Sequence, residues 1–266
     1  MEPADPVGGW LEIEDRGAVR WLTISRPDRR NAIPMDGWPD LEKAILDFDG
    51  SSSRVLVVTG AGGAFCSGAD LDASRLQGGL GVAAHHRRMK QVGAAAMALH
   101  RCSKPTIAAV DGIAAGAGLN LALGCDIAIA STRGRFSEIF VRRGLTVDFG
   151  GTWLLPRAVG LPRAKEMALS GRIVEAPEAL AIGLVLETVE ADRLEARATE
   201  LAESFVAGAP IAQMFAKQGL DRAFEVPFAA ALAWEDQAQA ICLTTADVHE
   251  GVAAFLEKRA PDFKGR

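Results

Sequence analysis

The spacing of hydrophobic residues divides the chain into an alternating first part and a helical last part. Short apolar runs that end at Gly, Pro or Asp predict buried strands. These runs are residues 18–25, 54–59, 106–110, 126–130 and 185–189. Apolar residues at helical spacing predict helices. The helical segments are residues 36–48, 87–100, 119–123, 164–169, 177–181, 191–207, 211–223, 228–243 and 247–258.

Strands and helices that alternate first and give way to helices alone are typical of an α/β core with a helical C-terminal part. No solenoid period, low-complexity stretch or linker interrupts the pattern. We therefore expect one core domain, residues 10–200, and a helical C-terminal region, residues 201–266, that depends on it.

Composition narrows the class of protein. The 266 residues suffice for a sizeable core, and 29 Lys and Arg against 34 Asp and Glu give a net charge of −5. Nucleic-acid-binding proteins usually carry a basic surplus, so that class is disfavoured. The N-terminus lacks the basic and apolar regions of a signal peptide, and no apolar run has transmembrane length. We expect a cytoplasmic protein.

Four cysteines are scattered along the chain without metal-binding spacing. They are Cys66, Cys102, Cys125 and Cys242. Because no Cys and His cluster accompanies them, we expect buried free thiols and no metal site.

Glycine is concentrated in three segments, residues 60–71, 111–120 and 143–152, each placed where a strand gives way to a helix. Glycine allows a ligand to approach the backbone, and the start of a helix offers free N–H groups. Two such loops that face each other can hold an oxyanion between two amides. Each loop alone is more typical of a structural turn. The spacings of a dinucleotide-binding turn, a P-loop and a nucleophile elbow are absent.

Four segments together resemble the crotonase (enoyl-CoA hydratase/isomerase) superfamily. Residues 64–71, AFCSGADL, are similar to its AFxxGADL segment, and residues 104–127 resemble its second signature. Arg26-Pro27 with Asn31-Ala32 resembles its N-terminal element, and residues 255–263 resemble its ending. The segments follow the family's order and spacing from about residue 21 to residue 263.

The resemblance implies an α/β fold, a crotonase-like spiral of ββα units with C-terminal helices that pack at a trimer interface. It implies an acyl-CoA thioester as substrate, with coenzyme A as part of the substrate and no other cofactor, and a trimer or a dimer of trimers. The thioester oxygen would lie between the amides of Ala69 and Ala117. The residues expected along the coenzyme A and the acyl group are Arg30, Asn31, Ala32, Ser67, Gly68, Asp70, Leu71, Gly116, Asn120 and Phe140. We expect Asp70 to brace its loop by accepting backbone hydrogen bonds.

The resemblance also indicates which acids are missing. Hydratases of this family use two glutamates, and Asn120 and Phe140 stand at those two positions. Asp148 stands where the ring-opening isomerase of the phenylacetate pathway and dienoyl-CoA isomerases carry an aspartate. Residues 144–157 and 116–123 look closest to the phenylacetate-pathway enzyme.

Elementary chemistry agrees with a single acid. Moving a double bond requires one proton to leave a carbon and return two carbons along, which one carboxylate can do in sequence. Hydration is helped by two acid/base groups. An apolar neighbour such as Phe140 would desolvate Asp148 and raise its basicity. We therefore expect an enoyl-CoA isomerase with Asp148 as the proton shuttle.

Other interpretations remain open. Asp148 could cap the helix that begins near Gly150, and Glu138, expected on the same strand face as Phe140, could be the base instead. The protein could be an enoyl-CoA hydratase that uses Asp148 or Glu138 with a water. It could also be an aryl-CoA dehalogenase-like enzyme with Asp148 as nucleophile, or an acyl-CoA binder without activity.

Overall fold

The computed structural model describes residues 7–71 and 81–266. The strands are β1 Leu11–Arg16, β2 Val19–Ile24, β3 Val55–Gly60, β4 Thr106–Val110, β5 Ile113–Ala115, β6 Ile127–Ser131, β7 Arg135–Ser137, β8 Val174–Glu175 and β9 Glu187–Val189. The α-helices are α1 Trp38–Asp49, α3 Val82–Arg101, α4 Ala117–Gly124, α5 Gly151–Val159, α6 Leu161–Ser170, α7 Ala176–Ala181, α8 Leu194–Val206, α9 Pro210–Asp221, α10 Phe228–Cys242 and α11 Ala246–Glu257. Short 3-10 helices are η1 Pro27–Arg29, η2 Ile139–Arg143 and η3 Ala191–Arg193.

The strands form two sheets. The larger has six strands in the order β1-β2-β3-β4-β6-β9, and the smaller has three in the order β5-β7-β8. Only the β1–β2 pair of the larger sheet is antiparallel. Strands β4 and β6 lie in the larger sheet, whereas β5 and β7, which follow them, lie in the smaller one. Two strands and then a helix per turn confirm the predicted crotonase-like spiral of ββα units.

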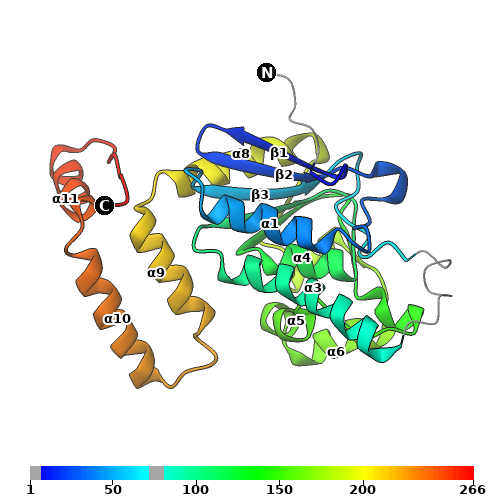
Figure 1. Ribbon diagram of the computed structural model, residues 1–266. Coiled ribbons are helices and arrows are strands. Elements are labelled where there is room, and N and C mark those ends of the chain that lie inside the picture. The colour runs from blue at the N-terminus through cyan, green and yellow to red at the C-terminus, as the bar shows by residue number, and fades with distance from the viewer. Residues whose placement is uncertain (1–6, 72–80) are drawn as a thin grey trace.

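Helices cover both faces of the larger sheet (Figure 1). On one face α8 places Leu194 and Ala198 against Val57 and Ile129. On the other face α1, α3 and α4 enclose the main apolar core. Burial on both faces explains why β3 begins with the uninterrupted apolar run Val55–Val58.

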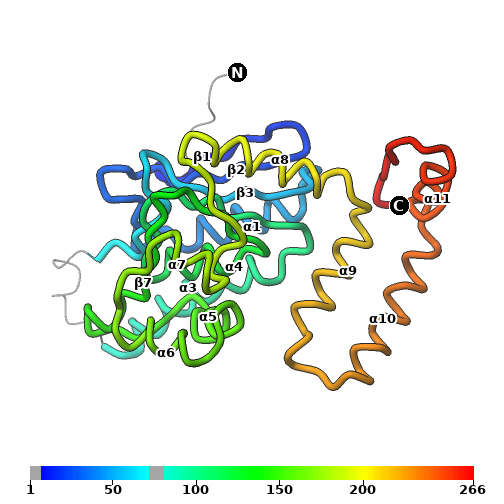
Figure 2. The backbone as a smooth tube through the Cα atoms, turned by 180° about the vertical axis from the view of Figure 1, so that it is seen from behind, coloured from blue at the N-terminus to red at the C-terminus, as the bar shows by residue number. Residues whose placement is uncertain are grey.

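Helices α10 and α11 stand apart from the sheets in both views (Figures 1 and 2), whereas α9 contacts the core through the ion pair of Lys217 with Asp126 at 2.9 Å. Helices α9 and α10 run side by side, with the Phe215 and Trp234 rings 6.0 Å apart, and α11 follows at the far end. Helix α8, which crosses residue 200, lies against the sheet. The division of the chain at residue 200 stays a prediction. No helix in the described part of the chain combines the length and the apolarity that a membrane crossing requires.

Most predicted elements are present within a few residues of their expected ends. The sequence did not reveal β1, whose pattern is largely polar and exposed, or the very short strands β5, β7 and β8. The predicted strand through Glu138 and Phe140 is wrong. Strand β7 ends at Ser137 because its partner β5 ends at Ala115, and the chain then turns into η2.

Candidate active site

Two glycine-rich loops meet at the carboxyl ends of β3 and β4. The loop after β3 is joined to β5 through Cys66, whose N–H donates to the Ile113 carbonyl (3.0 Å) and whose carbonyl accepts from the Ala115 N–H (2.9 Å). A Cβ at Gly68 would lie 2.8 Å from the Ala115 oxygen and 3.5 Å from the Ala117 nitrogen. The two backbones touch at Gly68, so a residue with a side chain would not fit there.

This contact brings the residue next to Ala69 close to the Ala117 nitrogen. On the two sides of Ala69, the Gly68 carbonyl accepts from Ile33 and the Asp70 N–H donates to Ile33, both at 2.8 Å, which turns the Ala69 N–H to the other side of the strand. Ala117 is the first residue of α4, so its N–H has no partner within the helix. Neither N–H donates a hydrogen bond to another of the described residues. Two free amides on facing loops are what an oxyanion site requires.

The expected coenzyme A segment, residues 30–32, is held to the first loop by Asn31. The Asn31 side chain is fully buried and accepts from the Arg26 N–H at 2.8 Å. It also donates to the Ala61 and Ala64 carbonyls at 2.8 and 2.6 Å. Asn31 therefore ties the two segments together. Arg30 and Asn31 both have left-handed backbones, with φ of 50° and 58°, so the chain turns sharply.

The other residues expected along coenzyme A follow Cys66 on the first loop. The Ser67 N–H donates to the Arg30 carbonyl (3.0 Å), and Leu71 is exposed. Asp70 ties its loop to the segment after β2, and the backbone bonds expected of it stay a prediction. Its carboxylate accepts from the Arg26 guanidinium at 2.9 Å, and the same guanidinium donates to the Ala32 carbonyl. The arginine reaches both because the segment after β2 folds over the loop.

One turn along α4, Asn120 connects the buried Glu138 and the half-buried Asp148. Its spacing of three from Ala117 places it on the same side of the helix. Its Nδ2 donates to the Asp148 main-chain carbonyl at 2.9 Å and lies 3.5 Å from the Glu138 carboxyl. A Cβ at Gly151 would overlap the Asn120 amide, so α5 approaches α4 closely here. Asn120 thus holds the loop of Asp148 beside Glu138.

Asp148 lies in the turn before α5 and does not cap that helix. The N-cap is Gly150, and no side chain caps the helix, so the capping interpretation is wrong. Burial raises the pKa of Asp148 from 3.8 to about 6. Its Oδ1 is buried and has no partner among the described residues. A carboxylate with these properties is a base near neutral pH.

Phe140 is buried, and its ring packs against Gly116 in the loop that precedes Ala117. Its Cζ lies 3.4 Å from the position that a Cβ at Gly116 would occupy. A side chain at Gly116 would thus press on Phe140, and Gly116 also has a positive φ of 56°. That Phe140 itself desolvates Asp148 stays a prediction.

Glu138 is the second buried acid, and the sequence analysis gave it only the place of a rival. It is fully buried at the end of β7, next to the Ser137 carbonyl that accepts from the Gly116 N–H at 2.8 Å. Burial raises its pKa to about 8; the Asn120 contact opposes that rise, and the Asp148 charge adds to it. A glutamate that directly follows a short strand beside a glycine-rich loop was the available signal.

Residues 7–71 and 81–266 contain no cluster of side chains that could bind a metal ion and no reactive pair of thiols. No three His, Cys, Asp or Glu side chains there could hold a metal ion. All four cysteines are free thiols; Cys66, Cys102 and Cys125 are buried as expected, whereas Cys242 on α10 is only half-buried. Burial raises the pKa of the Cys66 thiol to about 12, so it is unreactive at neutral pH.

The comparisons with known proteins identify the class to which this fold and site belong. Residues 14–266 match the enoyl-CoA hydratase/isomerase family. The short-chain-enoyl-CoA hydratase of Clostridium acetobutylicum is 36% identical, covering 96% of this chain and 97% of that protein. The 1,2-epoxyphenylacetyl-CoA isomerase of Escherichia coli is 35% identical, covering 93% of this chain and 95% of that protein.

Solved structures agree. A putative enoyl-CoA hydratase from Streptomyces coelicolor A3(2) superposes with a TM-score of 0.91 at 36% identity, covering 100% of this chain and 98% of that one. The chain belongs to the enoyl-CoA hydratase/isomerase family of the crotonase superfamily. It is an acyl-CoA-processing enzyme. Hydratases and an isomerase both stand among its relatives, so the family alone does not distinguish the two reactions.

Proposed function

We propose that this enzyme is an enoyl-CoA isomerase that moves a double bond through a thioester enolate. The Ala69 and Ala117 amides bind the thioester oxygen, and Asp148 removes a proton from the acyl chain. Asp148 then returns the proton two carbons along. Bonds and charge balance within the substrate, so neither water nor a redox partner is consumed.

The observation that carries this proposal is the state of Asp148. Its carboxyl is partly buried, the buried Oδ1 has no partner among the described residues, and its pKa is raised to about 6. Such a group is ionised at pH 7 yet basic enough to take a proton from a carbon whose conjugate enolate is stabilised. Asn120 and Phe140 stand where a hydratase of this family would carry its glutamates.

Within the isomerases, we propose a substrate class similar to that of the phenylacetate-pathway ring-opening enzyme. The likeness of residues 144–157 and 116–123 supports this, as does the 35% identity to the Escherichia coli 1,2-epoxyphenylacetyl-CoA isomerase. A panel of 3-enoyl-CoA thioesters and 1,2-epoxyphenylacetyl-CoA, assayed with the wild type, would rank these substrates.

The isomerase proposal is tested by Asp148→Asn and deuterated water. We expect the wild type to exchange acyl-chain protons and to convert 3-enoyl-CoA to 2-enoyl-CoA. The variant should lose both by about 10²–10⁴-fold, the contribution of a general base. Wild-type rates in the variant would refute the shuttle. A covalent adduct on Asp148, seen by mass spectrometry, would instead indicate the dehalogenase-like chemistry, and tight binding without exchange would indicate a binder.

A hydratase is the second candidate, and Glu138 is the observation that favours it. A carboxyl with a pKa of about 8 is protonated at neutral pH and could deliver a proton while Asp148 activates a water. Crotonyl-CoA distinguishes the two reactions. A hydratase converts it to the 3-hydroxy thioester, with loss of the enoyl absorbance, whereas an isomerase leaves it unhydrated.

For the ligand itself, we propose that coenzyme A runs along Arg30–Ala32 and Ser67–Leu71 and that no further cofactor is needed. The surface that these two segments share supports this path. The sharp turn at Arg30 and the Asn31 amide hold the segments together. The three buried, unpaired thiols support a reducing compartment, the cytoplasm.

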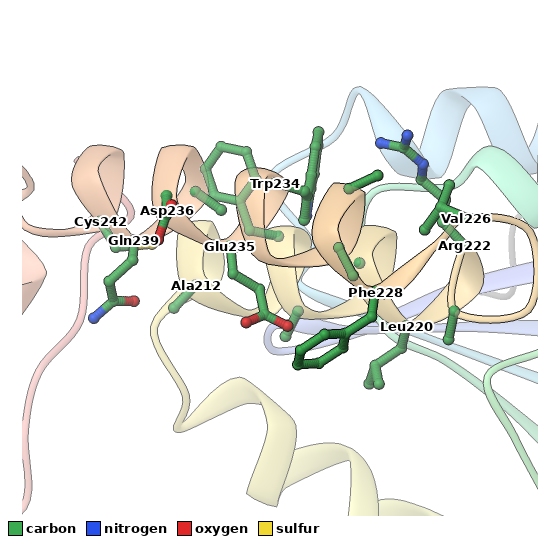
Figure 3. A pocket seen from close by; sticks show the side chains of 17 residues that line it. Ala212, Leu220, Arg222, Val226, Phe228, Trp234, Glu235, Asp236, Gln239 and Cys242 are labelled. Atoms are coloured by element: carbon green, nitrogen blue, oxygen red, sulfur yellow. The ribbon is translucent and has the colours of Figure 1, made fainter.

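We also propose that the enzyme is a homotrimer, or a dimer of trimers, assembled through α9–α11. Helices α10 and α11 stand away from the core. All three helices expose large apolar side chains. The most exposed of them, on these helices and on the connection between α9 and α10, are Leu220, Phe224, Phe228, Val252, Phe255 and Leu256. A groove of about 920 Å³ lies between α9 and α10, with Leu220, Phe228 and Trp234 among its lining residues (Figure 3). An apolar surface of this kind marks an interface.

Light scattering during size-exclusion chromatography measures the assembly. We expect three or six times the 28.1 kDa chain mass. Phe255→Asp and Leu256→Asp together should shift the mass toward the monomer. A monomeric wild type would refute the proposal.

A further inference from the structure

Glu138 has no role in a one-carboxylate shuttle, yet it is buried beside the shuttle residue. Its side chain is fully excluded from solvent. A buried carboxyl is costly to ionise, and proteins usually place one where it acts on a neighbour. Its position therefore requires an explanation that the proposed reaction does not supply.

The contacts lead from Glu138 to Asp148 through one amide. The Asn120 Nδ2 lies 3.5 Å from the Glu138 Oε2 and donates at 2.9 Å to the Asp148 main-chain carbonyl. Because a main-chain carbonyl can only accept, this second bond fixes which end of the Asn120 amide is the nitrogen. The same nitrogen thus faces both the acid and the loop of the proposed base.

The cluster also contains atoms without partners. Asn120 Oδ1, Glu138 Oε1 and Asp148 Oδ1 are buried and accept or donate no hydrogen bond among the described residues. Buried polar atoms without partners are rare and cost about 1–3 kcal/mol each. Three of them on residues that Asn120 links together indicate a site kept polar for function.

We propose that Glu138 is a positioning residue that acts as a neutral carboxylic acid, holding the Asn120 amide and through it the loop of Asp148. The inference rests on the proposed proton shuttle at Asp148. In this arrangement the Glu138 carbonyl oxygen accepts from Asn120, and its proton remains on the other oxygen. A negative charge is then carried by Asp148 alone.

The surroundings of Glu138 support the neutral form. Helix α4 has no titratable side chain, and Arg142 and Arg143 on η2 are exposed, with the Arg142 Nε donating to the Ser170 carbonyl. Asp148 is the charge that acts on Glu138, and it raises the pKa further. The values of about 6 and about 8 mean that Asp148 ionises first and Glu138 stays protonated at pH 7.

Two variants separate shape from charge. Glu138→Gln keeps the shape and stays neutral at every pH, whereas Glu138→Ala removes the contact with Asn120. Glu175→Gln, on the exposed end of the adjoining strand β8, is the matched control. Each is assayed by proton exchange in deuterated water and by isomerisation from pH 5 to pH 10, with a thermal melt to confirm folding.

We expect Glu138→Ala to lower kcat by about 10²-fold with KM changed less than about threefold, because a loop displaced by 1 Å costs that much in rate. Glu138→Gln should lower kcat by less than tenfold. In the wild type the rate should fall above about pH 8, because an ionised Glu138 places a second negative charge beside the enolate. That fall should be absent in Glu138→Gln and present in Glu175→Gln.

Three results would overturn the inference. Glu138→Gln could lose exchange as fully as Asp148→Asn, which would make Glu138 the base. Glu138→Ala could keep the wild-type rate, or the alkaline fall could persist in Glu138→Gln. If Glu138→Ala does not fold, the pH profile of Glu138→Gln decides alone. Wild-type exchange in Asp148→Asn would refute the shuttle instead, so the two failures are distinguishable.

Discussion

Replacing Asp148 by asparagine should stabilise the protein while it abolishes activity. The Asp148 carboxyl is partly buried and has no compensating cation among the described residues. Its negative charge therefore opposes folding. Asparagine has nearly the same shape and no charge. The expected gain is the free energy that the folded chain spends on keeping Asp148 ionised.

The magnitude follows from the pKa. A carboxyl whose pKa rises from 3.8 to about 6 on folding costs about 3 kcal/mol when ionised, because one pKa unit corresponds to about 1.36 kcal/mol. Between those two pH values the folded chain binds more protons than the unfolded chain, so the wild-type free energy of unfolding falls as pH rises. The penalty is complete above about pH 7 and absent below about pH 3.

The assay is equilibrium urea unfolding at one protein concentration, at pH 4.5 and at pH 8. We expect Asp148→Asn to exceed the wild type by about 1–3 kcal/mol at pH 8, less than the full penalty because the new amide must also be desolvated. At pH 4.5 the penalty on the wild type falls to about 1 kcal/mol, so the difference should shrink by about 2 kcal/mol. Asp28→Asn, at an exposed aspartate, is the control and should show no such gain.

A result that would refute the reasoning is an Asp148→Asn variant less stable than the wild type by the same amount at both pH values. The carboxylate would then be stabilising the fold by contacts rather than resisting burial, and its value as a poised base would be lost.

Three further predictions concern the same site. Ala117→Pro should lower kcat by about 10²–10³-fold and leave folding intact, because proline removes the amide N–H yet is tolerated at the first residue of a helix; circular dichroism and turnover measure the two effects. Gly151→Ala should lower the melting temperature and kcat together, since its methyl would overlap the Asn120 amide. The wild-type rate should rise with pH through about 6 as Asp148 ionises, and a rate independent of pH from 5 to 7 would contradict its role as base.

The sequence by itself determined the fold class, because long apolar runs such as Val55–Val58 and the helical spacing of the last third depend on local pattern alone. The crotonase motifs likewise indicated Ala69, Ala117 and Asp148. Local pattern could not reveal strands of two or three residues, which exist only because a partner strand lies beside them. The same dependence on a partner explains why the predicted strand through Glu138 is wrong: β7 ends at Ser137, where its partner β5 ends.

Only the tertiary structure decided how the site residues meet. Asn31 bonds Ala61, and Asp70 bonds Arg26, across 30 and 44 residues of chain. These contacts form only when the loops fold together. Glu138 and Asp148 are ten residues apart by number, and their link through Asn120 comes from a third segment. The raised pKa of each acid is a property of burial, which no spacing in the sequence measures.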